Sequence, residues 1–187
     1  MAGPTFDPTH AVRFDLQRGS VIAGTHERQV VLGCAALDDL VLIAGSEAAT
    51  AVGRTMGASI GERVAARLGG PDGVSRAAIE TVVSHLGGEL SLTGFGVLAI
   101  ERWGLAMVLL VERPAVRDMA FLASILEGAI EAATARPVRC LALGRDGRSV
   151  RVLLAGESAI TRAQTWLAEG VAWGDVLARL QPRDEGP

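Results

Sequence analysis

The clearest pattern of small, apolar and polar positions lies between residues 38 and 68, where a four-residue repeat predicts one long helix. One row of this helix is almost bare backbone, the next row is large and apolar, and the other two rows are mostly polar. An internal glycine costs a helix about 1 kcal/mol relative to alanine, so glycines at fixed spacing lower stability unless a close contact compensates. The small row consists of Gly45, Ala49, Gly53, Gly57, Gly61 and Ala65.

The small row predicts a surface at which another backbone approaches closely. Its partner is open at this point, because a helix of the same domain and a second copy of the chain would both benefit from it. Under the second hypothesis the helix forms an oligomer interface, assisted by the hairpin that runs from about residue 96 to residue 112. That interface would comprise Gly45, Ala49, Gly53, Gly57, Gly61, Phe95 and Trp103.

The rest of the chain alternates between strand-like and helix-like spacing. Period-two alternation predicts a strand at 12–16, and short apolar runs add strands at 21–23 and 30–32. Asp38 or Asp39 can cap the long helix, and Ser75 and Asp118 can begin the next two helices. A fourth helix is predicted from a capping box at Thr161, followed by a short helix from 174. Hairpins are predicted at 97–102 with 105–112, and at 138–143 with 149–154.

Strands and helices in this order, without βαβ alternation, predict an α+β fold in which long helices pack on antiparallel hairpins. At 187 residues the chain is long enough for one domain with a real core. We expect that domain at 12–181, between a flexible arm at 1–11 and a disordered tail at 182–187.

Composition narrows the possible functions. The longest apolar run, Leu105 to Val111, is too short to cross a bilayer, and no secretion signal is evident at the N-terminus. We therefore expect a cytoplasmic protein, in which Cys34 and Cys140 are free thiols. The net charge is −3 with scattered basic residues, which argues against nucleic-acid binding. No lysine is present, which excludes Schiff-base chemistry.

The motifs that could carry chemistry all have a structural interpretation. Residues 57–61 match G-x-S-x-G, but in the middle of a helix rather than at a strand-to-helix turn. His85 and Glu89 could share a metal, yet two ligands do not make a site, and a solvated pair is expected. Glu127 and Glu131, one helical turn apart, are likewise expected on a solvated face. We therefore expect no catalytic residues, no cofactor, no metal and no enzymatic activity.

Three segments together resemble the bacterial cellulose synthase D family, which are accessory proteins of cellulose biosynthesis. Val52 to Gly57 (VGRTMG) is similar to that family's V-G-R-x-M-G, and Gly94 to Glu101 resembles its W-G-x-V-x-L-[DE]. Phe121 to Gly128 (FLASILEG) is similar to W-L-A-x-V-L-E-G, although Phe95 and Phe121 replace the usual tryptophans. This resemblance implies a non-catalytic, self-associating accessory protein that organises glucan export beside a polysaccharide synthase.

Other segments resemble the vinyl-reductase-type, or TRAPP-like, hydrocarbon-binding domains. Their pattern is a helix carrying E-G-A, as at 127–129, before a strand that bears a cysteine, as at 138–144. The second cysteine of the zinc-binding members is missing here. This resemblance implies a homodimer that binds a small hydrophobic ligand or a protein partner. Its apolar pocket would be lined by Leu98, Leu109, Leu122, Ile125 and Ile130.

Overall fold

The computed structural model describes residues 6–9, 11–23, 27–104 and 106–181. Its helices and its two antiparallel sheets confirm the α+β prediction. The predicted tail at 182–187 and most of the predicted arm at 1–11 lie outside the described residues.

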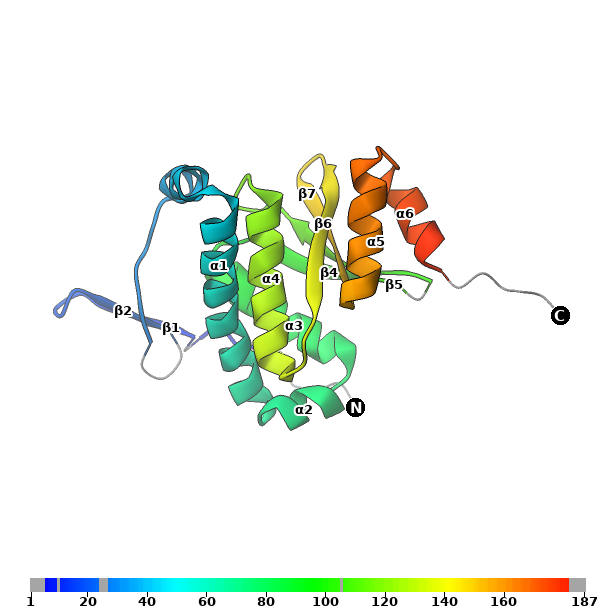
Figure 1. Ribbon diagram of the computed structural model, residues 1–187. Helices are drawn as coiled ribbons and strands as arrows, with labels where there is room; N and C mark the ends of the chain where they lie inside the picture. Colours follow the sequence, from blue (N-terminus) through cyan, green and yellow to red (C-terminus); the bar gives the residue numbers. More distant parts are fainter. Residues whose placement is uncertain (1–5, 10, 24–26, 105, 182–187) are drawn as a thin grey trace.

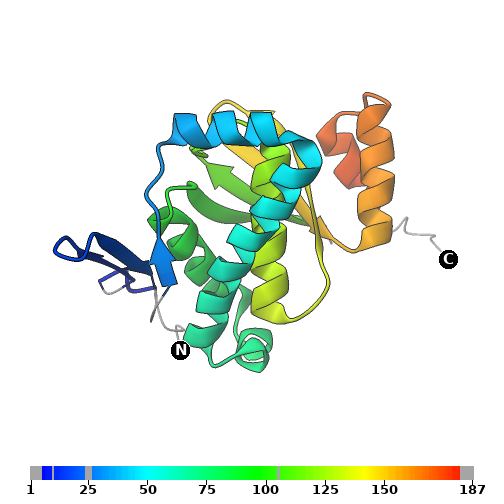
Figure 2. The ribbon, with the colours of Figure 1, turned by 60° about the vertical axis from the view of Figure 1, so that its left-hand side comes forward.

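A small N-terminal sheet stands away from the rest of the molecule (Figures 1 and 2). It consists of β1 (Val12–Asp15), β2 (Ser20–Ala23) and β3 (Glu27–Gln29), paired in that order. The strand predicted at 30–32 is wrong, because the register pairs Val21 with Gln29 and Ala23 with Glu27, which places the third strand earlier. Residues 30–32 follow the sheet as exposed apolar positions.

The long helix is α1 (Cys34–Leu68), and it bends sharply at Gly45 (Figure 2). Gly45 has φ 76° and ψ 167°, a conformation that essentially only glycine adopts. The helix begins at Cys34, earlier than predicted, with Gly33 at its N-cap. Asp38 does not cap it, since its carboxylate accepts a hydrogen bond from the amide of Arg117 at 2.8 Å.

Two shorter helices and a second long helix complete the helical layer. They are α2 (Pro71–Arg76), α3 (Ile79–Leu92) and α4 (Met119–Thr134), the last capped by Asp118 as predicted. Ser75 does not begin a helix but lies inside α2, because Pro71 starts that helix and extended backbone at Ala77 and Ala78 separates it from α3. Figure 1 shows α1 and α4 side by side along most of their length.

The larger sheet joins the two predicted hairpins. Its strands are β4 (Val97–Trp103), β5 (Ala106–Glu112), β6 (Arg139–Asp146) and β7 (Ser149–Ala155), in the order β4-β5-β7-β6. Both hairpins are confirmed, and the second turns at Gly147 with φ 56°. The β5–β7 ladder connects them into one four-stranded sheet.

Each face of this sheet carries its own hydrophobic core. Leu109 and Val152 face the main core, which α1, α3 and α4 complete. Val108 and Leu153, the next residues along the same strands, face a smaller core under α5 (Glu157–Ala168) and α6 (Trp173–Leu180). The strand period of two therefore separates the two cores.

The capping box predicted at Thr161 is wrong. Helix α5 begins one turn earlier, at Glu157, and the Thr161 hydroxyl donates a hydrogen bond to the Glu157 carbonyl inside the helix. Among the helices of the described residues, none is both long enough and apolar enough to cross a membrane.

Candidate functional site

The glycine row of α1 faces α4 of the same chain. A Cβ built on Gly57 would collide with the Ile125 carbonyl and would come within 2.8 Å of the Ala129 amide nitrogen. Gly53 meets α4 at Phe121 and Ser124 in the same way, and α4 returns the contact with a glycine of its own, Gly128, against Arg54. The close approach is therefore made within the chain, and these glycines are not available to a second copy.

The other residues of the predicted interface have three different environments. Gly61 and Ala49 are buried with the row, whereas Gly45 is exposed at the bend. Phe95 is buried in the main core, so it cannot contribute surface to an interface. Trp103 is partly exposed at the end of β4, with its ring edge-on to Trp173 at 5.3 Å between centroids.

The residues of the predicted apolar pocket come together in the main core. Two come from adjacent strands, Leu98 of β4 and Leu109 of β5, and three come from α4. All five are buried, namely Leu98, Leu109, Leu122, Ile125 and Ile130. The topology thus places them between the sheet and the helical layer, as a pocket lining would require.

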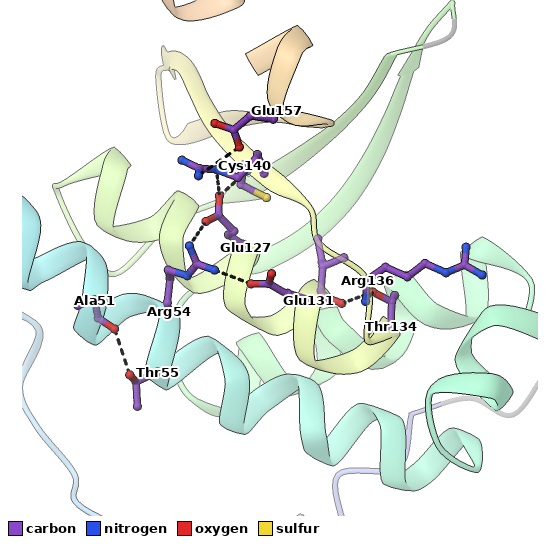
Figure 3. Close-up of polar contacts among 11 residues, drawn as sticks. Ala51, Arg54, Thr55, Glu127, Glu131, Thr134, Arg136, Cys140 and Glu157 are labelled. Carbon is purple, nitrogen blue, oxygen red and sulfur yellow. Dashed lines mark hydrogen bonds and ion pairs between the residues drawn. The ribbon is translucent and has the colours of Figure 1, made fainter. Parts of the chain in front are cut away.

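A buried carboxylate, Glu127, joins α1, α4 and β6 (Figure 3). Its oxygens lie 2.9 Å from Arg54 and 3.3 Å from Arg139, and it accepts a hydrogen bond from the Cys140 amide at 2.8 Å. Arg54 also pairs with Glu131 at 2.6 Å. The expectation of a solvated face is wrong for Glu127, because the α1–α4 contact and β6 cover it.

The Cys140 thiol lies beside this carboxylate. Burial, and after it the negative charge of Glu127, raise the pKa of Cys140 far above its ordinary value. The thiol is therefore protonated and unreactive at neutral pH.

A second buried carboxylate, Glu89, joins α3 to the last turns of α1. It receives a hydrogen bond from Arg63 Nε at 2.8 Å, and Arg67 Nη1 lies 2.7 Å from its other oxygen. Arg63 also reaches the Ser59 hydroxyl at 2.7 Å. The solvated pair expected from the sequence is wrong here, since Glu89 is 2% exposed and His85 is 4% exposed.

The N-terminal arm covers this second cluster. The Phe6 ring lies edge-on to His85, with centroids 6.0 Å apart and an interplanar angle of 79°. The Arg67 guanidinium lies over the same ring, 4.6 Å from its centroid. A Cβ on Gly88 would collide with the ring. Sequence reasoning missed this arrangement, because the arm has no periodicity and its partners lie about 60–80 residues away.

A third cluster lies on the other face of the sheet. Arg151 of β7 donates two hydrogen bonds to Glu101 of β4, at 3.0 and 3.3 Å, and its guanidinium stacks on Trp173 at 4.8 Å. The hydrogen bond from Arg151 is the main reason that the pKa of Glu101 lies below its ordinary value, and it raises the pKa of Arg151. The cluster attaches α6 to the sheet.

Exposed apolar side chains gather on the N-terminal segments. They lie on β1, on the connection before α1 and on the part of α1 before the bend, where Leu42 and Ile43 are both 81% exposed. Clusters of exposed apolar residues mark interaction surfaces. The set is Phe14, Leu16, Val30, Val31, Leu32, Leu40, Leu42 and Ile43, referred to below as the N-terminal apolar surface.

These side chains favour binding over catalysis. Each buried carboxylate is held by arginines, which stabilise its charged form and make it a poor proton donor or acceptor. Within the described residues, no group of three or more histidine, cysteine or acidic side chains is placed to hold a metal ion.

Comparison with known proteins identifies a structural relative. The fold is that of a solved sensory domain. It is similar to the crystal structure of the phenol-responsive sensory domain of the transcription activator PoxR with phenol, with a TM-score of 0.62. The likeness covers 95% of this chain and 100% of that chain at 16% sequence identity. No protein-family model matches the chain, and no curated protein matches it.

Proposed function

We propose that this protein is a binding module for a small apolar molecule and that it acts without catalysis. The observation that carries the proposal is the fold likeness to a sensory domain that was crystallised with phenol, over nearly the whole of both chains. At 16% identity the likeness concerns the fold, so the ligand of this chain is inferred by analogy. A small apolar ligand also agrees with the hydrocarbon-binding resemblance of the sequence.

The proposed ligand position lies between α4 and the inner face of β4 and β5. Leu98, Leu109 and Leu122 line this space together with Ile125 and Ile130. Pockets for small apolar ligands are lined mainly by such side chains and lie between packed layers. Binding at this position requires the side chains to move apart, which favours a ligand of one ring or a short alkyl chain.

We also propose that the protein forms a homodimer through the N-terminal apolar surface. A small sheet and a helix segment that expose Leu42 and Ile43 leave apolar area in water that a second copy would cover. A two-fold axis brings the same patch of both copies together, so one self-complementary surface suffices. The interface is thus placed on α1 before the bend, and the glycine row lies beyond the bend.

Native mass spectrometry of the purified chain tests both proposals. The expected result is a dimer that carries a small-molecule adduct, or that gains one when phenol is added. A tetramer or octamer without adducts would instead favour the accessory-protein hypothesis drawn from the cellulose synthase resemblance. A monomer that binds neither phenol nor any copurified molecule would contradict the proposed function.

Charge placed on the N-terminal apolar surface tests the dimer separately. Leu42→Glu with Ile43→Glu should give a folded monomer in analytical ultracentrifugation, because two carboxylates in each copy would be buried without partners. Val97→Glu is the matched control, since Val97 is an exposed apolar residue on β4. A double variant that stays dimeric would place the interface elsewhere.

A further inference from the structure

The Phe6 ring is held in the way that a protein holds a bound aromatic molecule. One edge meets the His85 ring, one face meets the Arg67 guanidinium, and the backbone of Gly88 lies directly against it. Ring-to-ring and cation–π contacts of this kind contribute to the recognition of aromatic ligands. The glycine matters here, because any side chain at that position of α3 would occupy the space of the ring.

The group beneath the ring carries more positive than negative charge. Arg63 and Arg67 share the single carboxylate of Glu89, and His85 adds no negative charge. Asp7, next to Phe6, is exposed and accepts hydrogen bonds from Thr9. Arginine presents five N–H donors in a planar fork, and the one contact to Glu89 uses a single nitrogen of Arg67.

We propose that Phe6 is an internal occupant of a binding site for aromatic carboxylates, formed by Arg67, His85 and Gly88. In the bound state the ring of the ligand replaces Phe6 against His85 and Gly88, while its carboxylate pairs with Arg67. The site lies at the contact of α1 with α3, apart from the five core residues proposed above, and rests on its own observations. The arm is then an autoinhibitory segment that an anionic aromatic ligand displaces.

Competition with Phe6 has a measurable consequence. A ligand binds only to the fraction of molecules in which the arm has left the site, so the closed arm weakens its apparent affinity by that fraction. Removal of the ring should therefore tighten binding, and about tenfold is expected if the arm is closed roughly 90% of the time. The same change should leave the contacts between ligand and Arg67 intact.

Titration calorimetry of the full chain with benzoate tests the proposal. Phe6→Ala should bind benzoate about tenfold more tightly than the unchanged protein. Phe14→Ala is the matched control, because Phe14 is an exposed phenylalanine of the same N-terminal region and should leave the affinity unchanged. Equal benzoate affinity in the unchanged protein and in Phe6→Ala would overturn the proposal, as would no binding by either.

The role of charge is tested in the Phe6→Ala background. Benzyl alcohol has a similar ring without a charge, so it should bind at least tenfold more weakly than benzoate. Adding Arg67→Gln should remove that preference, and equal binding of the two molecules before this change would overturn the proposal. Circular dichroism confirms that each variant is folded. If Phe6→Ala does not fold, Phe6→Leu replaces it, with about threefold tighter benzoate binding expected because the cation–π contact is lost.

Discussion

At the scale of single residues, the α1–α4 contact is governed by the space left at its glycines. The atoms that a Cβ on Gly57 would meet belong to the backbone of α4, which cannot rotate away as a side chain can. Gly174 of α6 has a helical environment too, but nothing lies within 4 Å of its Cβ position. The same substitution should therefore have opposite effects at these two glycines.

Gly57→Ala should lower the free energy of unfolding by roughly 1–3 kcal/mol, because the two helices must separate to admit the methyl group. Gly174→Ala should raise it by up to about 1 kcal/mol, through the better helix propensity of alanine. Urea unfolding followed by circular dichroism measures both. Equal effects at the two positions would show that α4 does not confine Gly57.

The two cysteines should differ in reactivity. Cys34, exposed at the start of α1, should react with a thiol reagent in the native protein. Cys140 should not react until the protein unfolds, because burial and the Glu127 charge raise its pKa. Counting reactive thiols with a disulfide reagent should give one in buffer and two in denaturant, and the Cys34→Ser variant should show none in buffer. A fast second thiol in native protein would contradict the burial of Cys140.

At the scale of elements, the bend in α1 separates a packed segment from an exposed one. Beyond Gly45 the helix lies on α4, and before it the helix carries exposed apolar side chains. The backbone of Gly45 lies outside the regions open to other residues, so the bend depends on this one glycine.

Gly45→Ala should destabilise the protein by about 1–3 kcal/mol, the usual range for a strained backbone conformation. Gly33→Ala is the control, since Gly33 has an ordinary φ of −68° and open space around it. Urea unfolding of the two variants provides the comparison. An unchanged stability for Gly45→Ala would mean that the segment before the bend reorients without cost.

The sequence predicted most elements because their signals are local. Alternation and turn residues indicate the hairpins, and Asp118 indicates the start of α4, since neighbouring residues decide both. The partner of the glycine row could not be predicted, because the row records only a close approach and not which backbone approaches. The burial of Glu89 and Glu127 was also missed. Their arginines come from α1, 26 and 73 residues earlier in the case of Arg63 and Arg54, and from β6.

At the scale of the whole molecule, the Glu101–Arg151 pair attaches the C-terminal helices to the sheet. Arg151 bonds Glu101 across β5 and stacks on Trp173 of α6, while Gln181 donates a hydrogen bond to the Trp103 carbonyl at 2.7 Å. Because hydrogen bonds from Arg151 hold the pKa of Glu101 below its ordinary value of 4.5, the ionised carboxylate favours the native state. This contribution is complete above about pH 4.5 and is lost as the pH falls through the lower, native pKa.

The Glu101→Gln variant should therefore be less stable than the unchanged protein at pH 7, by about 1 kcal/mol or less because solvent screens the partly exposed pair. The difference should shrink as the pH is lowered towards about 3.5. Glu112→Gln, at the exposed end of β5, is the control. Urea unfolding at several pH values gives both curves, and a difference that stays constant with pH would contradict the role assigned to the Glu101 charge.

The division of the hydrophobic interior by the sheet has a consequence for partial unfolding. Helices α5 and α6 bury their apolar faces only in the smaller core, so they can open while the main core stays dry. Opening of this kind exposes a contiguous unit at a free energy below that of global unfolding. Native-state hydrogen exchange should therefore show the amides of α5 and α6 exchanging together, and earlier than those of α4.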